Sequence, residues 1–422
     1  MLAEAPNSSF RINIDGISGT SAHDIEIAPN DSMYIFGEVT VDPDQPVSVS
    51  PFVIDEELIF ETNGNTQIVT LEAWGQNANY IPNRFSADSL NLLSCNGGDS
   101  IWDDEKPYVI FGALFIDNCT LTLPPGTRVY LHGGWARLVD DEGNFTTYND
   151  GFLFVLGNGK LNIIGTEENP VIIQGDRLEE EFQDVAGQWG GIRISTNSTG
   201  NVFKNVIIKN AIVGVRVDSA AQASFQDVQI YNTTSSGLIG IHANITAVNS
   251  LFHSSSGNSV QLEYGGNYDF KYCTLASYGV DASALRMTNL FCLDQLCSQY
   301  RVNDLNADFQ NTIVFGSRKD EISLFKADEA AFNYNFQNCI VRVDELDDDP
   351  PFTDFFDHCD PCFNGDTNTV LFADVDEDDY HLDTVSVAEE KAMVIPSIVL
   401  DLDGFDRDNE KPDVGCYEYQ YE

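Results

Sequence analysis

The residues of this sequence best suited to chemistry recur in four short segments of its middle part. Each segment alternates apolar and polar residues, which in a β-strand turns the polar ones toward one face. The polar positions are Arg193, Arg216, His242 and Gln261, followed two positions later by Ser195, Asp218, Asn244 and Glu263. Cationic and imidazole groups beside carboxylates could bind a ligand, or supply the base and the Ca²⁺-binding oxygens of a lyase. A solvated strand face with weak ion pairs explains the same pattern more simply, so we predict a binding face and no catalytic residue.

A second group of candidate ligands lies in the polar stretch 176–189, which is too long for an ordinary turn. Carboxylates crowd there at Glu179, Glu180, Glu181 and Asp184. Oxygen atoms of carboxylates are the ligands that Ca²⁺ prefers. A solubilising acidic surface is the alternative, so we assign no cofactor. Ca²⁺ is the candidate if a metal binds.

The segments that would position these residues belong to a repeat. Strand-like segments begin at Phe203, Phe225, Ala247 and Phe270, at steps of 22, 22 and 23 residues, and two more copies begin at Phe309 and Phe336. Short strands at such a period indicate a solenoid, in which each residue stacks on its counterpart about 4.8 Å away. We therefore predict an all-β chain with a right-handed parallel β-helix over residues 108–342.

Like residues share columns of this alignment. One column holds Asn205, Asp227, Asn249, Asn311 and Asn338, and another holds most of the phenylalanines. We expect the amides to form hydrogen bonds along the axis and the aromatic rings to stack inside. Cys273 and Cys339 take positions that valine holds in other rungs, so we expect both to be buried core thiols.

Three other regions differ in composition. Alternating strands separated by turn residues predict a small β-sandwich, possibly truncated, over residues 1–81, and residues 82–107 read as a linker. Residues 343–422 hold 25 acidic and 3 basic residues, which predicts an acidic cap or tail.

Composition excludes some classes of partner. The chain has 67 acidic and 21 basic residues, a net charge of −46, which repels nucleic acids and anionic membranes. No apolar run reaches the length of a transmembrane helix, and we expect neither a signal peptide nor a lipid anchor within the chain. Nine cysteines leave at least one unpaired. For the pairs 292/297 and 359/362 we favour local disulfides over zinc.

Several motifs carry a resemblance. They are the entry Gln188-Trp-Gly-Gly-Ile192 after an acidic loop, the ending with Asp379-Tyr-His-Leu382 and Lys411-Pro-Asp-Val-Gly-Cys-Tyr-Glu418, and Phe60-Glu-Thr-Asn-Gly-Asn65 in the first module. With the rung pattern, they resemble right-handed parallel β-helix surface proteins, most of all uncharacterised Bacteroidetes lipoproteins with an N-terminal β-sandwich. The resemblance implies an exported protein at the cell exterior or outer-membrane surface.

Two functions remain open at this stage. The first is a non-catalytic surface protein that binds extended polysaccharides or serves as an adhesive or scaffolding element. The second is a polysaccharide lyase or glycoside hydrolase acting on the same polar face, although the Gly-His-Gly, Asn-Thr-Asp and Asp-Asp elements of polygalacturonase-like β-helices are missing from the sequence. The sequence leaves the ligand and the oligomeric state undetermined.

Overall fold

The computed structural model describes residues 1–14, 16–29, 31–40, 53–74, 78–82, 91–139, 145–179 and 181–420. The secondary structure in this part of the chain is β-strands and three short 3-10 helices, η1 (Leu346–Asp348), η2 (Phe355–His358) and η3 (Val375–Glu377). The chain divides into two compact units, one of residues Met1–Asn79 with Leu178–Glu180 and one of Tyr80–Arg177 with Glu181–Glu422. We call the second the helix unit. No helix in the described part is long and apolar enough to cross a membrane.

The N-terminal unit consists of antiparallel strands. Its strands are β1 (Phe10–Ile14), β2 (Ile17–Gly19), β3 (Ile35–Val39), β4 (Val53–Thr62) and β5 (Asn65–Trp74). The first three form one sheet and the last two form a hairpin, closed by an Asn63-Gly64 turn with positive φ at both residues. A small core joins Leu2, Phe10 and Leu58. The predicted sandwich remains a prediction for this unit.

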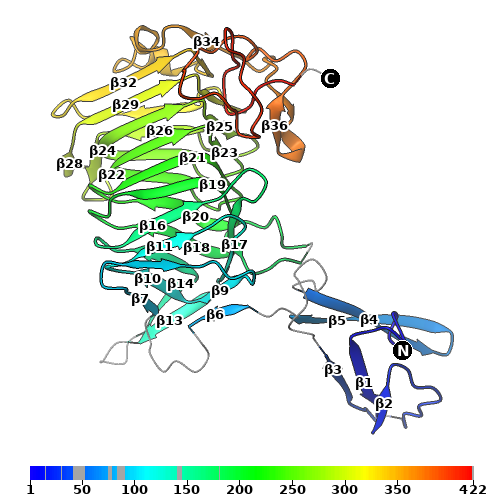
Figure 1. The fold of residues 1–422 in the computed structure, drawn as a ribbon. Coiled ribbons are helices and arrows are strands. Elements are labelled where there is room, and N and C mark those ends of the chain that lie inside the picture. Colours follow the sequence, from blue (N-terminus) through cyan, green and yellow to red (C-terminus); the bar gives the residue numbers. More distant parts are fainter. Residues whose placement is uncertain are drawn as a thin grey trace. The chain divides into compact units, whose positions relative to one another are not determined.

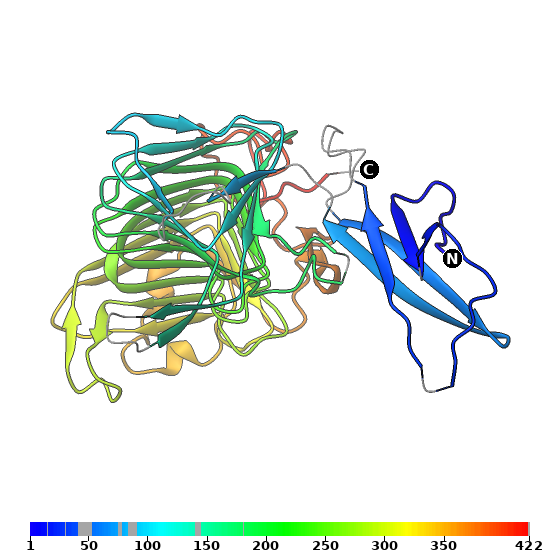
Figure 2. The same ribbon diagram turned by 90° about the horizontal axis from the view of Figure 1, so that it is seen from below.

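In its described residues the helix unit is built around one continuous sheet of 25 strands, whose neighbours pair in parallel as the chain coils (Figures 1 and 2). The coil begins with β6 (Asn79–Ile81), β7 (Asn91–Leu93), β8 (Asp99–Ile101), β9 (Tyr108–Phe111), β10 (Ala113–Ile116), β11 (Thr120–Leu123), β12 (Arg128–His132), β15 (Phe152–Val155), β16 (Lys160–Ile164), β17 (Val171–Gly175), β18 (Trp189–Ile194), β19 (Asn201–Lys209) and β20 (Ala211–Val217). It continues with β21 (Gln222–Tyr231), β22 (Leu238–Val248), β23 (Leu251–Phe252), β24 (Val260–Lys271), β25 (Thr274–Ser277), β26 (Leu285–Thr288), β29 (Leu305–Gln310), β30 (Ile313–Gly316), β31 (Ile322–Phe325), β32 (Phe332–Gln337), β33 (Cys339–Val341) and β34 (Cys362–Asn364). The described part of the unit also contains three hairpins outside this sheet: β13 (Trp135–Val139) with β14 (Phe145–Asn149), β27 (Leu290–Cys292) with β28 (Tyr300–Val302), and β35 (Phe372–Asp374) with β36 (Asp379–Leu382).

The predicted rung register is confirmed by the strand pairing. In successive rungs Phe203 pairs with Phe225, Phe270 with Phe309, and Phe309 with Phe336, and the ring centroids lie 4.8, 5.1 and 4.6 Å apart. These rings are almost fully buried. The all-β parallel β-helix predicted from the repeat is therefore the fold of the helix unit.

The coil begins earlier than predicted. Strands β7 and β8 lie within the expected linker 82–107, and they pair in parallel with β10 and β11. A disulfide between Cys95 and Cys119 joins these two rungs. Strands of three residues between Asn and Gly turns carry too little periodicity to be recognised as rungs.

The two cysteine pairs and the two core thiols named in the sequence prediction are confirmed. Disulfides join Cys292 to Cys297 and Cys359 to Cys362. Cys273 and Cys339 are buried free thiols, and burial raises the pKa of each to about 12. Both are inert core residues at neutral pH.

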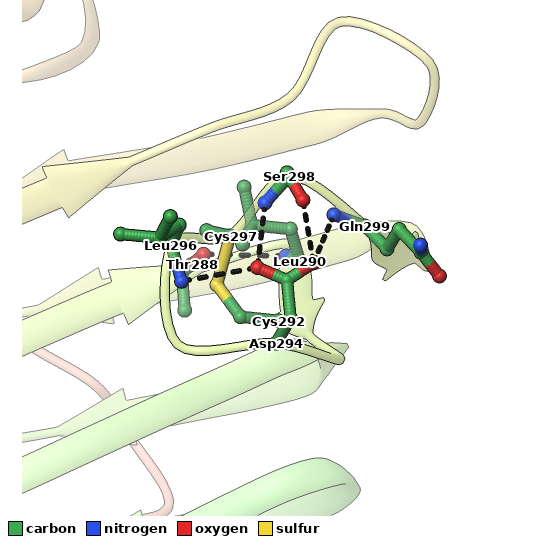
Figure 3. The surroundings of a disulfide bond; sticks show 8 residues. All are labelled: Thr288, Leu290, Cys292, Asp294, Leu296, Cys297, Ser298 and Gln299. Atoms are coloured by element: carbon green, nitrogen blue, oxygen red, sulfur yellow. Dashed lines mark hydrogen bonds between the residues drawn. A yellow bond between two sulfur atoms is a disulfide. The ribbon is translucent and has the colours of Figure 1, made fainter.

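Disulfide Cys292–Cys297 closes the tip of the β27–β28 hairpin (Figure 3). The carboxylate of Asp294 accepts hydrogen bonds from the backbone N–H groups of Leu296, Ser298 and Gln299 and from the Ser298 hydroxyl. The hydroxyl of Ser298 is the largest cause of the lowered pKa of Asp294. The loop is thus fixed by its own side chains.

The asparagine column marks a corner at which the backbone adopts positive φ. The residues at this corner are Asn205, Asp227, Asn249, Tyr272, Asn311 and Asn338, with φ between 47° and 55°. Asn and Asp tolerate this left-handed conformation better than other non-glycine residues. The expected amide ladder is only partly correct, because Asn249 Nδ2 donates to Asp227 Oδ1 (3.2 Å) but also to the carbonyl of Leu400 (2.8 Å). Asn311 likewise donates to the carbonyl of Met393 (2.7 Å), so the column mainly binds the C-terminal segment.

The C-terminal region is a cap only in its first part. Residues 343–364, with η1, η2 and β34, cover the last rung through Leu346, Phe352 and Phe355. Residues 371–417, which we call the strap, run back along the side of the coil (Figure 1). They bury apolar side chains against β23, β25, β30 and β33. The expected acidic cap therefore becomes an end cap followed by a lateral strap.

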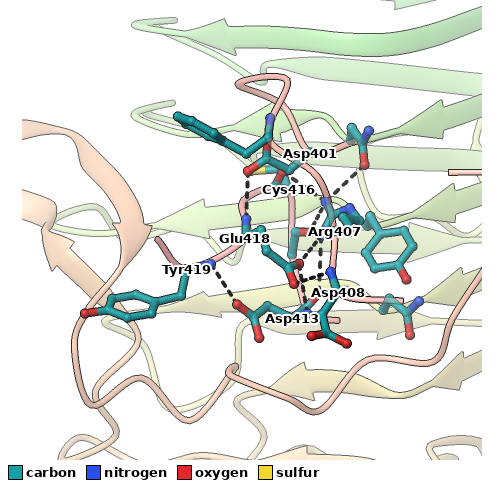
Figure 4. A network of polar contacts seen from close by, with 12 residues as sticks. Asp401, Arg407, Asp408, Asp413, Cys416, Glu418 and Tyr419 are labelled. Carbon is teal, nitrogen blue, oxygen red and sulfur yellow. Dashed lines mark hydrogen bonds and ion pairs between the residues drawn. The ribbon is translucent and has the colours of Figure 1, made fainter. Parts of the chain in front are cut away.

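Arg407 anchors the strap through a buried network (Figure 4). Its guanidinium donates to Asn249 Oδ1 (3.1 Å), to the carbonyls of Gly415 (3.0 Å) and Cys416 (3.1 Å), and to Glu418 (3.3 Å). The same group lies 4.0 Å from the ring centroid of Tyr272. One arginine thus connects the strap to the asparagine corner.

Replacing Asn249 with Leu should lower the free energy of unfolding by about 1–3 kcal/mol, because the buried guanidinium of Arg407 loses an acceptor and the Leu400 carbonyl and Asp227 carboxylate lose a donor. Asn249 is 4% exposed. Asn197→Leu is the matched control, since Asn197 also has positive φ but is exposed. Chemical denaturation of both variants checks the prediction, and equal losses would show that backbone strain, not the strap contact, explains the effect.

His381 should make the strap sensitive to pH. Its Nε2 lies 2.8 Å from Asp403 Oδ2 and its Nδ1 lies 2.6 Å from Asp379 Oδ1. The hydrogen bond to Asp403, above all, raises the pKa of His381 from 6.5 to about 9. The imidazolium therefore stabilises the folded state fully below pH 6.5, and this contribution is lost as the pH rises to 9. We expect the Tm advantage of the wild type over His381→Gln to shrink across this window; a constant difference would contradict the assignment.

Candidate functional site

Three of the predicted site residues share one column of the coil. Arg193 on β18 pairs with Arg216 on β20, and the column continues through Ile239 to Gln261. Asp218 and Glu263 lie beside this column and bind its members. The sequence thus placed these polar residues on one outward file.

His242 was assigned to this column wrongly. It lies at a corner with φ of 48°, and its ring faces Tyr264 at 5.7 Å. The predicted column aligned His242 with Arg216, and therefore Gly240 with Gly214, which would pair Val215 with Ile241. Strand β22 instead pairs Val215 with Leu238, three residues earlier. The true counterpart of Gly214 is Gly237, since a Cβ on Gly214 would come within 2.4 Å of the Gly237 carbonyl oxygen. The same shift of register removes Asn244 from the predicted face and pairs it with Gln222 and Asn267.

The polar residues of this column form hydrogen bonds and ion pairs with one another and with their neighbours. Both Arg193 and Arg216 donate from Nε to the carboxylate of Asp218, at 2.7 and 2.8 Å, and the Asp218 side chain is 8% exposed. Gln261 accepts from Ser236 (2.7 Å) and donates to Glu263 (2.6 Å). These residues act first as a network that joins rungs, and ligand binding by them remains a prediction.

The acidic stretch shows no assembled metal site in the described part of the chain. Among those residues no three His, Cys, Asp or Glu side chains gather around one point. Asp184 pairs with Lys209 (3.4 Å), and Glu180 lies outside the described residues. Calcium binding by Glu179, Glu181 and their neighbours therefore remains a prediction.

A second histidine, His132, forms an ion pair between two rungs. His132 ends β12, and its Nδ1 lies 2.6 Å from Asp176 Oδ2 in the next rung. This hydrogen bond is the largest cause of the raised pKa of His132. The pair borders a pocket of 290 Å³ that also contains Asp150 and Trp189. The buried carboxylate of Asp176 favours the charged form of the His132 imidazole, so the two side chains form an ion pair between rungs.

A regular row of amides forms the most distinctive polar surface. The row consists of Gln222, Asn244, Asn267, Asn306 and Asn333, which are in register on β21, β22, β24, β29 and β32. Each of the last three donates from Nδ2 to the Oδ1 of the asparagine before it, at 2.8, 3.1 and 2.9 Å. We call these five residues the asparagine ladder.

The ladder borders a shallow groove. Two residues further along the same strands lies a parallel row of Ser224, Thr246, Asp269 and Asp308. Between the rows, residues such as Ile245 and Tyr268 point into the core and are buried. The two rows line a groove of 470 Å³ across four rungs. We call it the asparagine groove.

The sequence contains a signal for this groove that the predicted binding face does not include. In each of four rungs an asparagine stands three positions before the residue of the phenylalanine column: Asn244 before Ala247, Asn267 before Phe270, Asn306 before Phe309, and Asn333 before Phe336. The offset places ladder residues outward when the column faces inward. The sequence prediction instead grouped Asn244 with Ser195, Asp218 and Glu263, which concealed the row.

The ladder leaves hydrogen-bonding capacity toward solvent. A primary amide has two N–H donors and an oxygen with two lone pairs. Within the ladder a central residue such as Asn267 uses one donor and one lone pair. One donor and one acceptor per rung remain for a ligand, at the strand spacing of about 4.8 Å.

The sequence matches no protein-family profile, and no curated protein is significantly similar to it. Similar solved structures include a tailspike protein from Acinetobacter baumannii bacteriophage Fri1, a capsular polysaccharide depolymerase, with 11% identity and a TM-score of 0.33 over 67% of this chain and 53% of that chain. The periplasmic alginate epimerase AlgG gives 9% identity and a TM-score of 0.24 over 58% of this chain and 72% of that chain. A mutant of the same epimerase gives 9% and 0.26, over 58% of this chain and 79% of that chain. The chain thus spans about half the length of the tailspike, and we base its function on its own residues.

Proposed function

We propose that this chain is an extracellular or cell-surface protein that binds an extended glycan in the asparagine groove without cleaving it. The observation that carries the proposal is the asparagine ladder, an exposed row of amides with one spare donor and one spare acceptor per rung. Hydroxyl groups both donate and accept hydrogen bonds, so a polyhydroxylated chain matches such a row.

The disulfides support the proposed location. Three disulfides, including Cys95–Cys119 between two rungs, occur in the described part of the helix unit. Structural disulfides persist in oxidising compartments and are rare in the cytosol. An exported protein that meets polysaccharides outside the cell is consistent with them.

The Asn267→Ala variant tests the binding proposal. Loss of one or two ligand hydrogen bonds should weaken glycan binding about 3- to 10-fold. Calorimetry against a panel of oligosaccharides measures the effect, with Asn368→Ala as the matched control, since Asn368 is exposed and lies outside the groove. Equal affinities of both variants and the wild type would show that the ladder does not bind the glycan.

One observation favours the enzymatic alternative. Asp269 and Asp308 are in register on adjacent strands of the groove, about 4.8 Å apart along the axis. Retaining glycosidases hold their two carboxyl groups about 5–5.5 Å apart. Against this reading, Lys271 Nζ lies 2.6 Å from Asp269 Oδ2 and competes for that carboxylate. Release of new reducing ends by the wild type, but not by Asp308→Asn, would establish cleavage and contradict a purely binding role.

A further inference from the structure

We infer that the asparagine groove selects a neutral glycan that runs along the coil axis, in preference to a polyuronate. This inference rests on the proposed glycan-binding function and adds the class of ligand. It comes from the charges of the groove and the direction of its ladder.

The charges that face the groove are negative. Among its described lining residues, Asp269 and Asp308 are the charged ones, and no Lys, Arg or His belongs to the lining. The ammonium group of nearby Lys271 is bound to Asp269 at 2.6 Å. A carboxylate on each sugar would therefore meet two carboxylates and no opposing cation of the lining.

The electrostatic potential of the whole chain is also negative. The chain carries a net charge of −46, which repels a polyanion before contact and does so most at low salt.

Hydrogen bonding also favours a neutral glycan over a polyuronate. The carboxylate of a uronate only accepts hydrogen bonds, so it would use the spare amide donors and offer no donor to the spare amide oxygens or to Asp308. Hydroxyl groups can serve all of these.

The direction of the ladder sets the direction of the ligand. Its five residues come from five successive levels, Gln222 to Asn333, so the row extends over about 19 Å along the axis. A glycan lying along the axis meets one amide after another, whereas a glycan lying along a strand meets one or two. Affinity should therefore rise with chain length until the oligosaccharide covers the row.

Calorimetry with the full chain tests the inference, with neutral gluco-oligosaccharides and oligogalacturonates of equal lengths at low and high salt in EDTA. We expect the neutral series to bind with little dependence on salt, and the uronates to bind at least about tenfold more weakly at low salt. In the Asp269→Asn/Asp308→Asn variant the ratio of uronate to neutral affinity should rise several-fold. The matched control Asp328→Asn/Asp348→Asn removes two exposed charges elsewhere and should leave that ratio near the wild-type value.

Tighter binding of uronates than of neutral chains at low salt, or an unchanged ratio in the groove variant, would overturn the choice of a neutral ligand and leave glycan binding intact. Binding of neither series would overturn the proposed function together with this inference. Affinity that does not change with oligosaccharide length would overturn the axial direction alone.

Discussion

Replacing Arg407 with Met should lower the free energy of unfolding of the helix unit by about 3–5 kcal/mol. The Arg407 side chain is 2% exposed, and its ion-pair partner Glu418 is 8% exposed. Methionine retains most of the volume but removes the cation paired with the Glu418 carboxylate, which keeps only the backbone N–H groups of Asp408 and Asp413. It also removes the Arg407 hydrogen bonds to the oxygen of Asn249 and to the carbonyls of Gly415 and Cys416. An uncompensated buried charge is among the largest single defects that a folded protein can contain.

Lys411→Met is the matched control for this variant. Lys411 also pairs with a glutamate of the strap, Glu390 at 2.8 Å, but the two side chains are 64% and 53% exposed. Exposed pairs contribute at most about 1 kcal/mol. Urea denaturation of both variants measures the difference. A loss below about 1 kcal/mol for Arg407→Met would mean that the strap does not depend on the network.

Phe309→Ala should cost about 3–5 kcal/mol, because it removes a ring from the middle of the aromatic stack. Phe309 is fully buried between Phe270 and Phe336, whose ring centroids lie 5.1 and 4.6 Å away. Parallel strands on both sides hold the neighbouring rungs at fixed spacing, so the cavity cannot collapse easily.

Phe325→Ala provides the comparison, since Phe325 is on a coil strand but 54% exposed. We expect a change within about 0.5 kcal/mol for it. Thermal or chemical unfolding of both variants suffices. If Phe309→Ala proved as mild as Phe325→Ala, the interior would have to be more deformable than its close packing indicates.

The fold could be predicted because every rung of a solenoid has the same packing requirements. Each rung must place an apolar residue inward at the same phase, so Phe225, Phe270 and Phe309 reveal the period without any knowledge of distant contacts. The corner column was equally visible, since positive φ favours Asn and Asp. Its partners were not, because Asn249 and Arg407 are 158 residues apart and no local pattern connects them.

The candidate site was predicted less well for a related reason. Arg193, Arg216 and Gln261 were placed correctly because strand alternation fixes which side chains face outward. The position of His242 depended on which of two nearby glycines continues the column, and both Gly237 and Gly240 satisfy local rules. The backbone approach at Gly214, which decides between them, is a contact between rungs and cannot be read from one strand.

The strap ties the length of one part of the chain to that of another. Asn338, Asn311 and Asn249 hold the strap at Lys391, Met393 and Leu400, in order, as it passes the rungs in reverse. A duplicated rung between Asn249 and Asn311 would separate these anchor points by about another 4.8 Å, which takes at least two more residues at the roughly 3.5 Å that each residue can span. Solenoids usually grow or shrink by whole repeats, but here a change in repeat number requires a compensating insertion or deletion some hundred residues downstream. Among homologues, repeat number and strap length should therefore vary together, or both should be constant.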